Sequence, residues 1–288
     1  MNPVVEKIVP KSDAVTGWPQ WVRFTRTVLS LIVLLVLSVA LDLWFRLQIV
    51  ALYRKNKRRR SAAVNRLVRV WGRLCTAASK RTFPFEVDVR GTAPTAGRYL
   101  VVANHQSSTD PPILIAVLDR LNLKFVALEM LRYGKPAVSI AIRHGGFATV
   151  AKENLGVDMV ELDRFGRNME QHDGSPVIFP EGRRCEADGK LLPFHYAGIE
   201  AVRRSSGLPL LPVVLNTKHP SRTLKDYYHL VGARITVTIL DPIPFDEVQR
   251  DPRATYQALE ETIRRTVREI RAEEELSESN AANARTGS

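Results

Sequence analysis

The chain contains only two cysteines, Cys75 and Cys185, which lie far apart in the 288-residue sequence. This number and spacing indicate neither a disulfide framework nor the paired ligands of a zinc site. The scarcity of cysteine suits a reducing compartment. Neither thiol is assigned a catalytic role.

Motifs that read nucleic-acid bases are also missing. The sequence shows no zinc finger, recognition helix or aromatic-basic sheet motif, and it has no internal repeat. Its composition, 45% hydrophobic and 25% charged residues, is that of a folded protein. A formal net charge of +12 nevertheless predicts an anionic partner. The position of that charge has to distinguish nucleic acid from anionic lipid.

One long apolar run stands near the N-terminus, from Val28 to Phe45, and only Asp42 interrupts it. A bilayer span needs about 20 apolar residues, so this run is at the lower limit. Its length and its carboxylate leave open a tilted, re-entrant or interfacial helix as well as a span. We predict that the segment anchors the chain in a membrane.

A dense basic block follows the apolar run and comprises Arg54, Lys55, Lys57, Arg58, Arg59 and Arg60. Beside an apolar helix, such a block meets anionic headgroups and keeps its flank in the cytoplasm. This position favours lipid over nucleic acid. From Ala62 to Ala78, apolar residues at helical spacing predict a basic amphipathic helix at the membrane interface. A core-facing helix with a solvated face has the same pattern.

After residue 80, short apolar runs alternate with longer mixed segments, which predicts an α/β fold with a mixed, largely parallel sheet flanked by helices. Strands are expected at 85–89, 99–103, 124–127, 146–150, 177–179, 210–215 and 235–240, and helices at 112–120, 157–171, 198–205 and 252–275. We divide the chain into an N-terminal polar segment (1–27), a membrane-associated helical segment (28–80), an α/β domain (81–276) and a tail (277–288). The small polar residues of the tail predict disorder.

The first candidate site follows the apolar run Tyr99–Ala103. Asn104 and His105 come directly after this run, at the carboxyl end of a predicted strand, where open α/β sheets bind ligands. Asp110 stands five residues beyond His105, so a turn is needed to bring the two side chains together. The carboxylate would then orient the imidazole for proton abstraction. Alternatively, Asp110 caps the helix that Pro111 begins, because Asp followed by Pro is a common helix start.

Asn-His-x4-Asp after an apolar strand resembles the first motif of the glycerolipid acyltransferases, which include bacterial 1-acylglycerol-3-phosphate acyltransferases. A second segment, Phe179–Arg184, is similar to the Phe-Pro-Glu-Gly motif of that family. The resemblance implies that Glu181, Gly182 and Arg184 bind the acyl acceptor. Arg183 replaces the small hydroxyl residue usual in the motif. On composition alone, this segment is equally a structural turn with solvated charges.

Three further segments relate to the same family. Lys152 stands where the family has an arginine for the acceptor phosphate, and it keeps the charge without the bidentate geometry. The run from Leu210 to Val214 resembles the last motif, which also reads as an ordinary buried strand. After Pro193-Phe194, the family often has lysine and glycine, whereas this chain has His195. The resemblance covers about residues 85–240.

The resemblance implies an O-acyltransferase in which His105 is the general base and Asp110 orients it, with Asn104, Lys152, Glu181, Gly182 and Arg184 as substrate-binding residues. The donor would be acyl-CoA or acyl carrier protein, and the acceptor lysophosphatidic acid, at the cytoplasmic face of the cell membrane. No bound cofactor, no metal and no nucleic acid is expected. The alternatives are a different acceptor, such as lyso-ornithine lipid, and a non-catalytic lipid-binding relative.

Overall fold

The computed structural model describes residues 19–49, 56–82, 85–151, 159–185, 189–217 and 233–286. Within these residues a seven-stranded sheet has the order β1-β7-β6-β2-β5-β3-β4. Its strands are β1 (Glu86–Arg90), β2 (Leu100–Ala103), β3 (Leu123–Leu128), β4 (Ala148–Val150), β5 (Ser175–Ile178), β6 (Leu210–Thr217) and β7 (Arg234–Ile239). All neighbours are parallel except β6 and β7. The predicted mixed, largely parallel sheet is confirmed.

The central strands are the most apolar ones. Every residue of β2, β5 and β6 is buried, because helices cover both faces of the sheet. β2 pairs in parallel with β5 on one side and with β6 on the other. The carboxyl ends of these three strands therefore meet at one edge, and the chain segments that follow them are brought together there.

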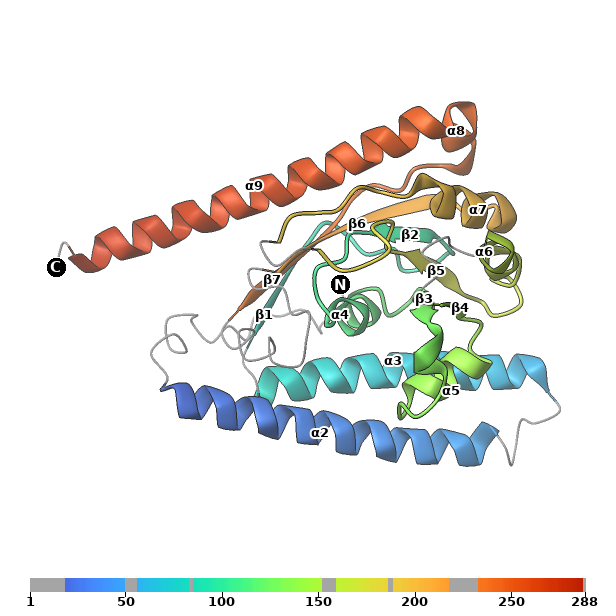
Figure 1. Ribbon diagram of the computed structural model, residues 1–288, viewed down its shortest axis with the longest axis horizontal. Helices are drawn as coiled ribbons and strands as arrows, with labels where there is room; N and C mark the ends of the chain where they lie inside the picture. Colours follow the sequence, from blue (N-terminus) through green and yellow to red (C-terminus); the bar gives the residue numbers. More distant parts are fainter. Residues whose placement is uncertain are drawn as a thin grey trace.

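Alternate residues of each strand enter two different cores, as the pleat requires. Val101 and Ala103 pack with α2 (Gln20–Leu47), α3 (Lys57–Thr82) and α4 (Asp110–Val117). Leu100 and Val102 pack with α6 (Met159–Arg167), α7 (Tyr196–Ser206) and α9 (Pro252–Thr286). Figure 1 shows the result, with α2, α3 and α4 below the sheet and α7 and α9 above it. The shorter helices are η2 (Glu129–Arg132), α5 (Val138–His144) and α8 (Phe245–Arg250).

α2 and α3 lie side by side and run in opposite directions (Figure 1). The indole of Trp71 donates a hydrogen bond to Oγ of Ser38 at 3.0 Å, which joins the two helices. α3 then packs closely on α4, because a Cβ added at Gly72 would lie 2.3 Å from Cγ2 of Ile115. The pair of helices α2 and α3 therefore packs against α4, the helix that follows the first motif.

α2 contains the candidate membrane span of the described residues, Trp21–Leu47, with 27 residues. At about 1.5 Å per residue, this helix exceeds the hydrocarbon thickness of about 30 Å. Large apolar side chains project from it, including Trp21 (70% exposed) and Trp44 (60% exposed). By length and composition, α2 could anchor the chain in a membrane.

Asp42, the interruption in the apolar run, faces the protein. It is 8% exposed, forms an ion pair with Arg46 and accepts a hydrogen bond from the backbone N–H of Ala137 at 3.0 Å. Ala137 has φ +61° and precedes α5, so the carboxylate fixes a backbone conformation that alanine rarely adopts. The Asp42 carboxylate of α2 thus points toward the α/β domain, where it binds the backbone of Ala137.

Some expected boundaries are wrong. The helix expected from residue 28 begins at Gln20, because Trp21 and Phe24 extend its apolar face past intervening arginines. The expected disordered tail is instead helical to Thr286, since alanine and glutamate propagate a helix that the domain has already nucleated. η2, α5 and α8 were not expected, and they are too short to show a helical period. Residues 1–18 and part of the predicted basic block lie outside the described residues.

Candidate active site

His105 and Asp110 face each other across the turn between β2 and α4. His105 is the second residue after β2, and Asp110 is the first residue of α4. Nδ1 of His105 lies 2.8 Å from Oδ2 of Asp110. The turn required by the sequence pattern is present, and the pairing at Nδ1 leaves Nε2 as the ring nitrogen that can meet a substrate.

The carboxylate of Asp110 organises the turn instead of capping the helix. Its Oδ2 also accepts hydrogen bonds from the backbone N–H groups of Gln106 (2.7 Å) and Ser107 (2.8 Å). The N-cap position belongs to Thr109, which makes no side-chain cap hydrogen bond. Three donors converge on one buried oxygen, so the orientation of the carboxylate is fixed. The interpretation of Asp110 as a simple helix cap is therefore not supported.

The segment after β5 holds His105 from the other side. The imidazole stacks on the ring of Phe179, with 4.1 Å between centroids and 16° between planes. The backbone N–H of His105 donates to Oε1 of Glu181 at 2.7 Å, and its carbonyl accepts from the N–H of Cys185 at 2.8 Å. The His105 side chain is 18% exposed. The first and second motifs thus form one unit that leaves one part of the imidazole accessible.

Glu181 uses both carboxylate oxygens within the protein. While Oε1 binds His105, Oε2 accepts the backbone N–H of Leu192 at 2.7 Å, and the residue is 2% exposed. Burial raises the pKa of Glu181, and the two amide hydrogen bonds oppose this shift. The acceptor-binding role expected from the sequence is not the one this geometry favours, because Glu181 holds two backbone segments together.

Asn104 and Gln106 connect the same turn to β6. Asn104 is fully buried, and its amide makes two 2.8 Å hydrogen bonds with the backbone N–H and carbonyl of Leu215. Oε1 of Gln106 accepts the N–H of Thr217 at 2.6 Å. These hydrogen bonds hold the turn that contains His105 against β6. The substrate contact expected for Asn104 stays a prediction.

Gly182 and Arg184 lie beside this unit. Gly182 has φ +69° and donates its N–H to the carbonyl of Phe179 at 3.0 Å, so it forms a tight turn for which glycine is suited. Arg184 is half-buried and precedes Cys185, whose amide binds His105. The structure therefore brings the backbone of Arg184 next to the pair of His105 and Asp110. Lys152 lies outside the described residues.

An arginine of α9 supports the loop that holds Glu181. The guanidinium of Arg264 donates to the carbonyls of Leu191 (3.1 Å) and Leu192 (2.6 Å) and pairs with Glu260 at 2.6 Å. A chain of contacts therefore runs from α9 through Leu192 and Glu181 to the backbone of His105. Local sequence gives no signal for this role, because Arg264 is far from its partners in the chain.

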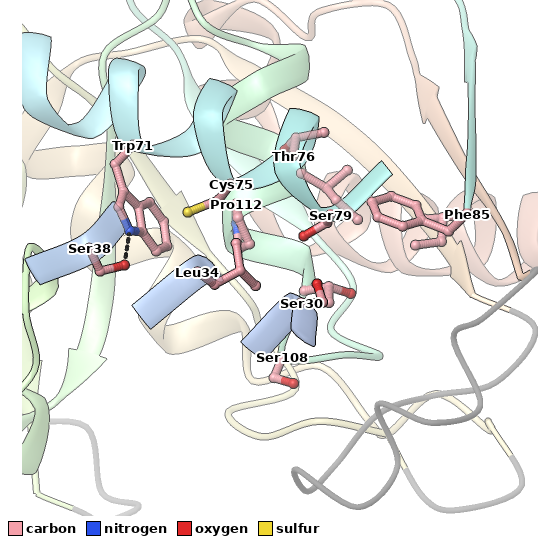
Figure 2. Close-up of a pocket in the computed structure, with 13 residues that line it drawn as sticks. Ser30, Leu34, Ser38, Trp71, Cys75, Thr76, Ser79, Phe85, Ser108 and Pro112 are labelled. Atoms are coloured by element: carbon pink, nitrogen blue, oxygen red, sulfur yellow. Dashed lines mark hydrogen bonds between the residues drawn. The ribbon is translucent and has the colours of Figure 1, made fainter. Parts of the chain in front are cut away.

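A cavity of about 260 Å³ adjoins the turn, between α2, α3 and the start of α4 (Figure 2). Its wall combines apolar and hydroxyl side chains: Ser30, Leu34, Ser38, Trp71, Cys75, Thr76, Ser79, Phe85, Ser108, Thr109, Pro112, Ile113 and Ile235. Burial raises the pKa of the Cys75 thiol to about 12, so the thiol is uncharged at neutral pH. The cavity is an uncharged space between the turn that precedes Asp110 and the apolar helix α2.

The described residues contain no group of three or more His, Cys, Asp or Glu side chains that could hold a metal ion. What the site does contain is an imidazole paired with a buried carboxylate, and this pair can remove a proton from a hydroxyl. An imidazole that is held by a carboxylate and is partly accessible suits the transfer of a chemical group to a hydroxyl oxygen.

Comparison with known proteins agrees with this chemistry. Residues 85–216 match the family model described as Acyltransferase. The chain is 24% identical over 197 residues to the mouse (Mus musculus) "1-acyl-sn-glycerol-3-phosphate acyltransferase alpha", which covers 68% of this chain and 67% of that protein. The human (Homo sapiens) protein of the same name is 25% identical over 186 residues, covering 62% of each chain. The match therefore spans about three fifths to two thirds of these relatives.

The fold also has a solved counterpart. The crystal structure of PlsC from Thermotoga maritima, a 1-acyl-sn-glycerophosphate (LPA) acyltransferase, superposes with a TM-score of 0.58. The superposition covers 82% of this chain and 97% of that chain, with 22% sequence identity. At this identity the likeness concerns the fold.

Proposed function

Residues 85–216 match the model of the Acyltransferase family, and from this similarity we propose that the chain transfers an acyl group to the free hydroxyl of a lysophospholipid. The most suitable acceptor is 1-acylglycerol-3-phosphate, which would become phosphatidic acid. The mouse relative and the Thermotoga maritima enzyme are named for this substrate. The donor would be the thioester of acyl-CoA or of acyl carrier protein.

The observation that carries the proposal is the pair of His105 and Asp110, 2.8 Å apart. Nε2 of His105 accepts the hydroxyl proton while the oxygen attacks the carbonyl carbon of the thioester. The tetrahedral intermediate then breaks its C–S bond, and the imidazolium returns the proton to the departing sulfur. An ester and a free thiol result, with no change in oxidation state. Asp110 stabilises the imidazolium and keeps Nε2 directed at the acceptor.

The surroundings of the pair suit a lipid. We place the acyl chain in the uncharged cavity next to Ser108 and Thr109, and the acceptor headgroup near Arg184 and Lys152. α2 would hold the domain on the cytoplasmic face of the membrane, so that the acceptor enters from the bilayer. In this proposal Glu181 and Asn104 position the turn and do not touch the substrate.

A second acceptor class is favoured by two departures from the family pattern. Arg183 replaces a hydroxyl residue, and His195 stands where lysine and glycine are usual. Both changes alter the expected phosphate contacts, so a lyso-aminolipid such as lyso-ornithine lipid is the alternative acceptor. Preference for that lipid over lysophosphatidic acid would select this alternative.

The test is an assay of the detergent-solubilised chain with labelled lyso-lipids and with both types of thioester donor. His105→Ala is expected to lower turnover by about 10²- to 10⁴-fold, the usual contribution of a positioned base. The matched control is His144→Ala, because His144 lies at the end of α5 and takes no part in the hydrogen bonds of the turn. Turnover that survives in His105→Ala would contradict the mechanism. If the wild type consumes no thioester, the chain is instead a lipid-binding relative.

A further inference from the structure

A loop beside the anchor carries large apolar side chains on its surface. Leu128, Met130 and Tyr133 are 38%, 67% and 66% exposed, and all three lie within the short stretch formed by the end of β3 and η2. A single exposed apolar residue is ordinary, whereas a cluster of large ones marks a contact surface. We call residues 128–135 the exposed loop.

The exposed loop is held in a defined shape. Oγ of Ser139 accepts the N–H of Lys135 at 2.9 Å and donates to the carbonyl of Leu131 at 3.1 Å. Directly after the loop, Ala137 has φ +61° and binds Asp42 of α2 through its N–H. A strained residue persists only where its surroundings enforce it. The loop is thus fixed to α2. Close to Asp42 in the sequence, α2 exposes the apolar side chains of Leu43, Trp44 and Leu47.

Cations surround the apolar side chains. Arg132 and Lys135 are exposed within the loop, where Glu129 is the acidic residue. The guanidinium of Arg143 in α5 lies 5.8 Å from the ring centroid of Tyr133. Burial lowers the pKa of His144 at the end of α5, and the positive charges of Arg60, Arg143 and Arg46 lower it further, so these cations lie near the end of α5.

This arrangement combines two features of surfaces that bind membranes. Tyrosine and tryptophan are enriched at the level of lipid headgroups, where their rings are half apolar and half polar. Cations beside an anionic leaflet each strengthen binding by about 1 kcal/mol, or roughly fivefold. A surface that exposes both, and that is tied to an apolar helix of membrane length, matches an anionic bilayer better than it matches a soluble protein.

We propose that the exposed loop is a second membrane contact, in which Met130 and Tyr133 enter the lipid interface and the neighbouring cations bind anionic headgroups. This inference rests on the membrane placement of α2 proposed above. It requires no acyl transfer. The domain would then touch the bilayer at two points, so that it could not rotate about α2.

The first test places an environment-sensitive fluorophore on the loop. Met130→Cys is labelled in the full-length chain and reconstituted into nanodiscs of phosphatidylcholine, or of phosphatidylcholine mixed equally with phosphatidylglycerol. Glu261→Cys in α9 is the control position, since its side chain is 64% exposed on the opposite face of the sheet (Figure 1). The native thiols are buried, and the labelled wild type gives their background.

The label at position 130 is expected to shift to shorter emission wavelengths and to be quenched by brominated lipid. Both effects should be larger with phosphatidylglycerol, while the label at position 261 behaves as in water. Identical emission at the two positions would overturn the membrane contact. Equal responses in the two lipids would overturn the selection of anionic headgroups. These readouts do not depend on turnover, so they separate this inference from the proposed reaction.

The second test changes the charge. Arg143→Glu is expected to weaken partition onto vesicles containing phosphatidylglycerol by about an order of magnitude, and to leave partition onto phosphatidylcholine unchanged. Arg265→Glu in α9 makes the same charge change at a side chain that is 61% exposed and should have no effect. Equal losses for both variants would contradict the proposal. Circular dichroism of Arg143→Glu checks that it is folded, and the fluorophore test stands if it is not.

Discussion

The backbone N–H of His105 donates to Oε1 of Glu181 at 2.7 Å, and this hydrogen bond joins the ends of β2 and β5. The motif containing Glu181 resembles a substrate-binding motif, but the carboxylate is occupied on both oxygens by backbone amides. We therefore expect Glu181 to act in the proposed reaction by keeping the turn that contains His105 in place.

Glu181→Ala should lower kcat and leave the KM for the acceptor nearly unchanged. The substitution leaves the buried amides of His105 and Leu192 without their acceptor, at a cost of about 1–3 kcal/mol each in the free energy of unfolding. Steady-state kinetics and thermal denaturation measure the two effects. Glu181→Gln keeps one acceptor oxygen and should recover part of the kcat. A raised acceptor KM with an unchanged kcat would instead assign Glu181 to substrate binding.

Arg264→Met should reduce kcat more mildly than Glu181→Ala. Arg264 binds the carbonyls of Leu191 and Leu192, but its side chain is 28% exposed, so water replaces part of what is lost. We expect a loss of about 1 kcal/mol in the free energy of unfolding. Arg265→Met, at the neighbouring and more exposed position, should be close to neutral. An identical kcat for both variants would show that α9 does not support the catalytic turn.

Cys75→Trp should shorten the acyl chain that is transferred. Cys75 is 7% exposed and lines the cavity between α2 and α3, so an indole there would occupy the space proposed for the chain. Leu74→Trp is the matched control, because Leu74 is 39% exposed on the same helix. Mass spectrometry of the lipid products gives the chain lengths. An unchanged length profile in Cys75→Trp would place the acyl chain elsewhere.

Lys124→Met should flatten the dependence of stability on pH in the alkaline range. Lys124 is fully buried against Asn65 of α3, and burial lowers its pKa from 10.5 to about 7. Between these values the unfolded chain binds a proton that the folded chain does not, so the stability of the wild type rises as the pH increases from about 7 to 10.5.

The measurement is urea denaturation of both proteins at several pH values. Lys124→Met also leaves Asn65 without its donor, which gives an offset that does not vary with pH. The difference in the free energy of unfolding should therefore move in favour of the wild type as the pH rises. A constant difference would show that Lys124 titrates alike in the folded and unfolded chain.

Much of the sheet could be predicted because its strands are short apolar runs bounded by polar segments. All seven runs expected as strands overlap strands of the structure. α5 could not be predicted, since it has seven residues and begins after a backbone conformation at Ala137 that a contact with Asp42 enforces. Such elements depend on residues distant in the chain, and a local pattern does not contain them.

In the candidate site, too, local contacts could be predicted from the sequence and contacts between distant residues could not. The pairing of His105 with Asp110 was predictable, because only four residues of turn lie between them. The backbone partners of Asn104 and Glu181 were not, since Leu215 and Leu192 are distant in the chain and meet them only after folding. A sequence motif identifies which polar side chains matter near a strand end, but not whether they face the substrate or the backbone.

The close approach at Gly72 fixes the position of α4 relative to α3. With no side chain at this position, α3 rests directly on Ile115 of α4, and α4 begins at Asp110. Among the described residues, the helix pair α2 and α3 therefore contacts the helix that follows the turn without an intervening element. On the proposed membrane placement, a domain held in this way would sample lipids by lateral diffusion in two dimensions, and its encounters would depend on the number of acceptor molecules per unit area of membrane.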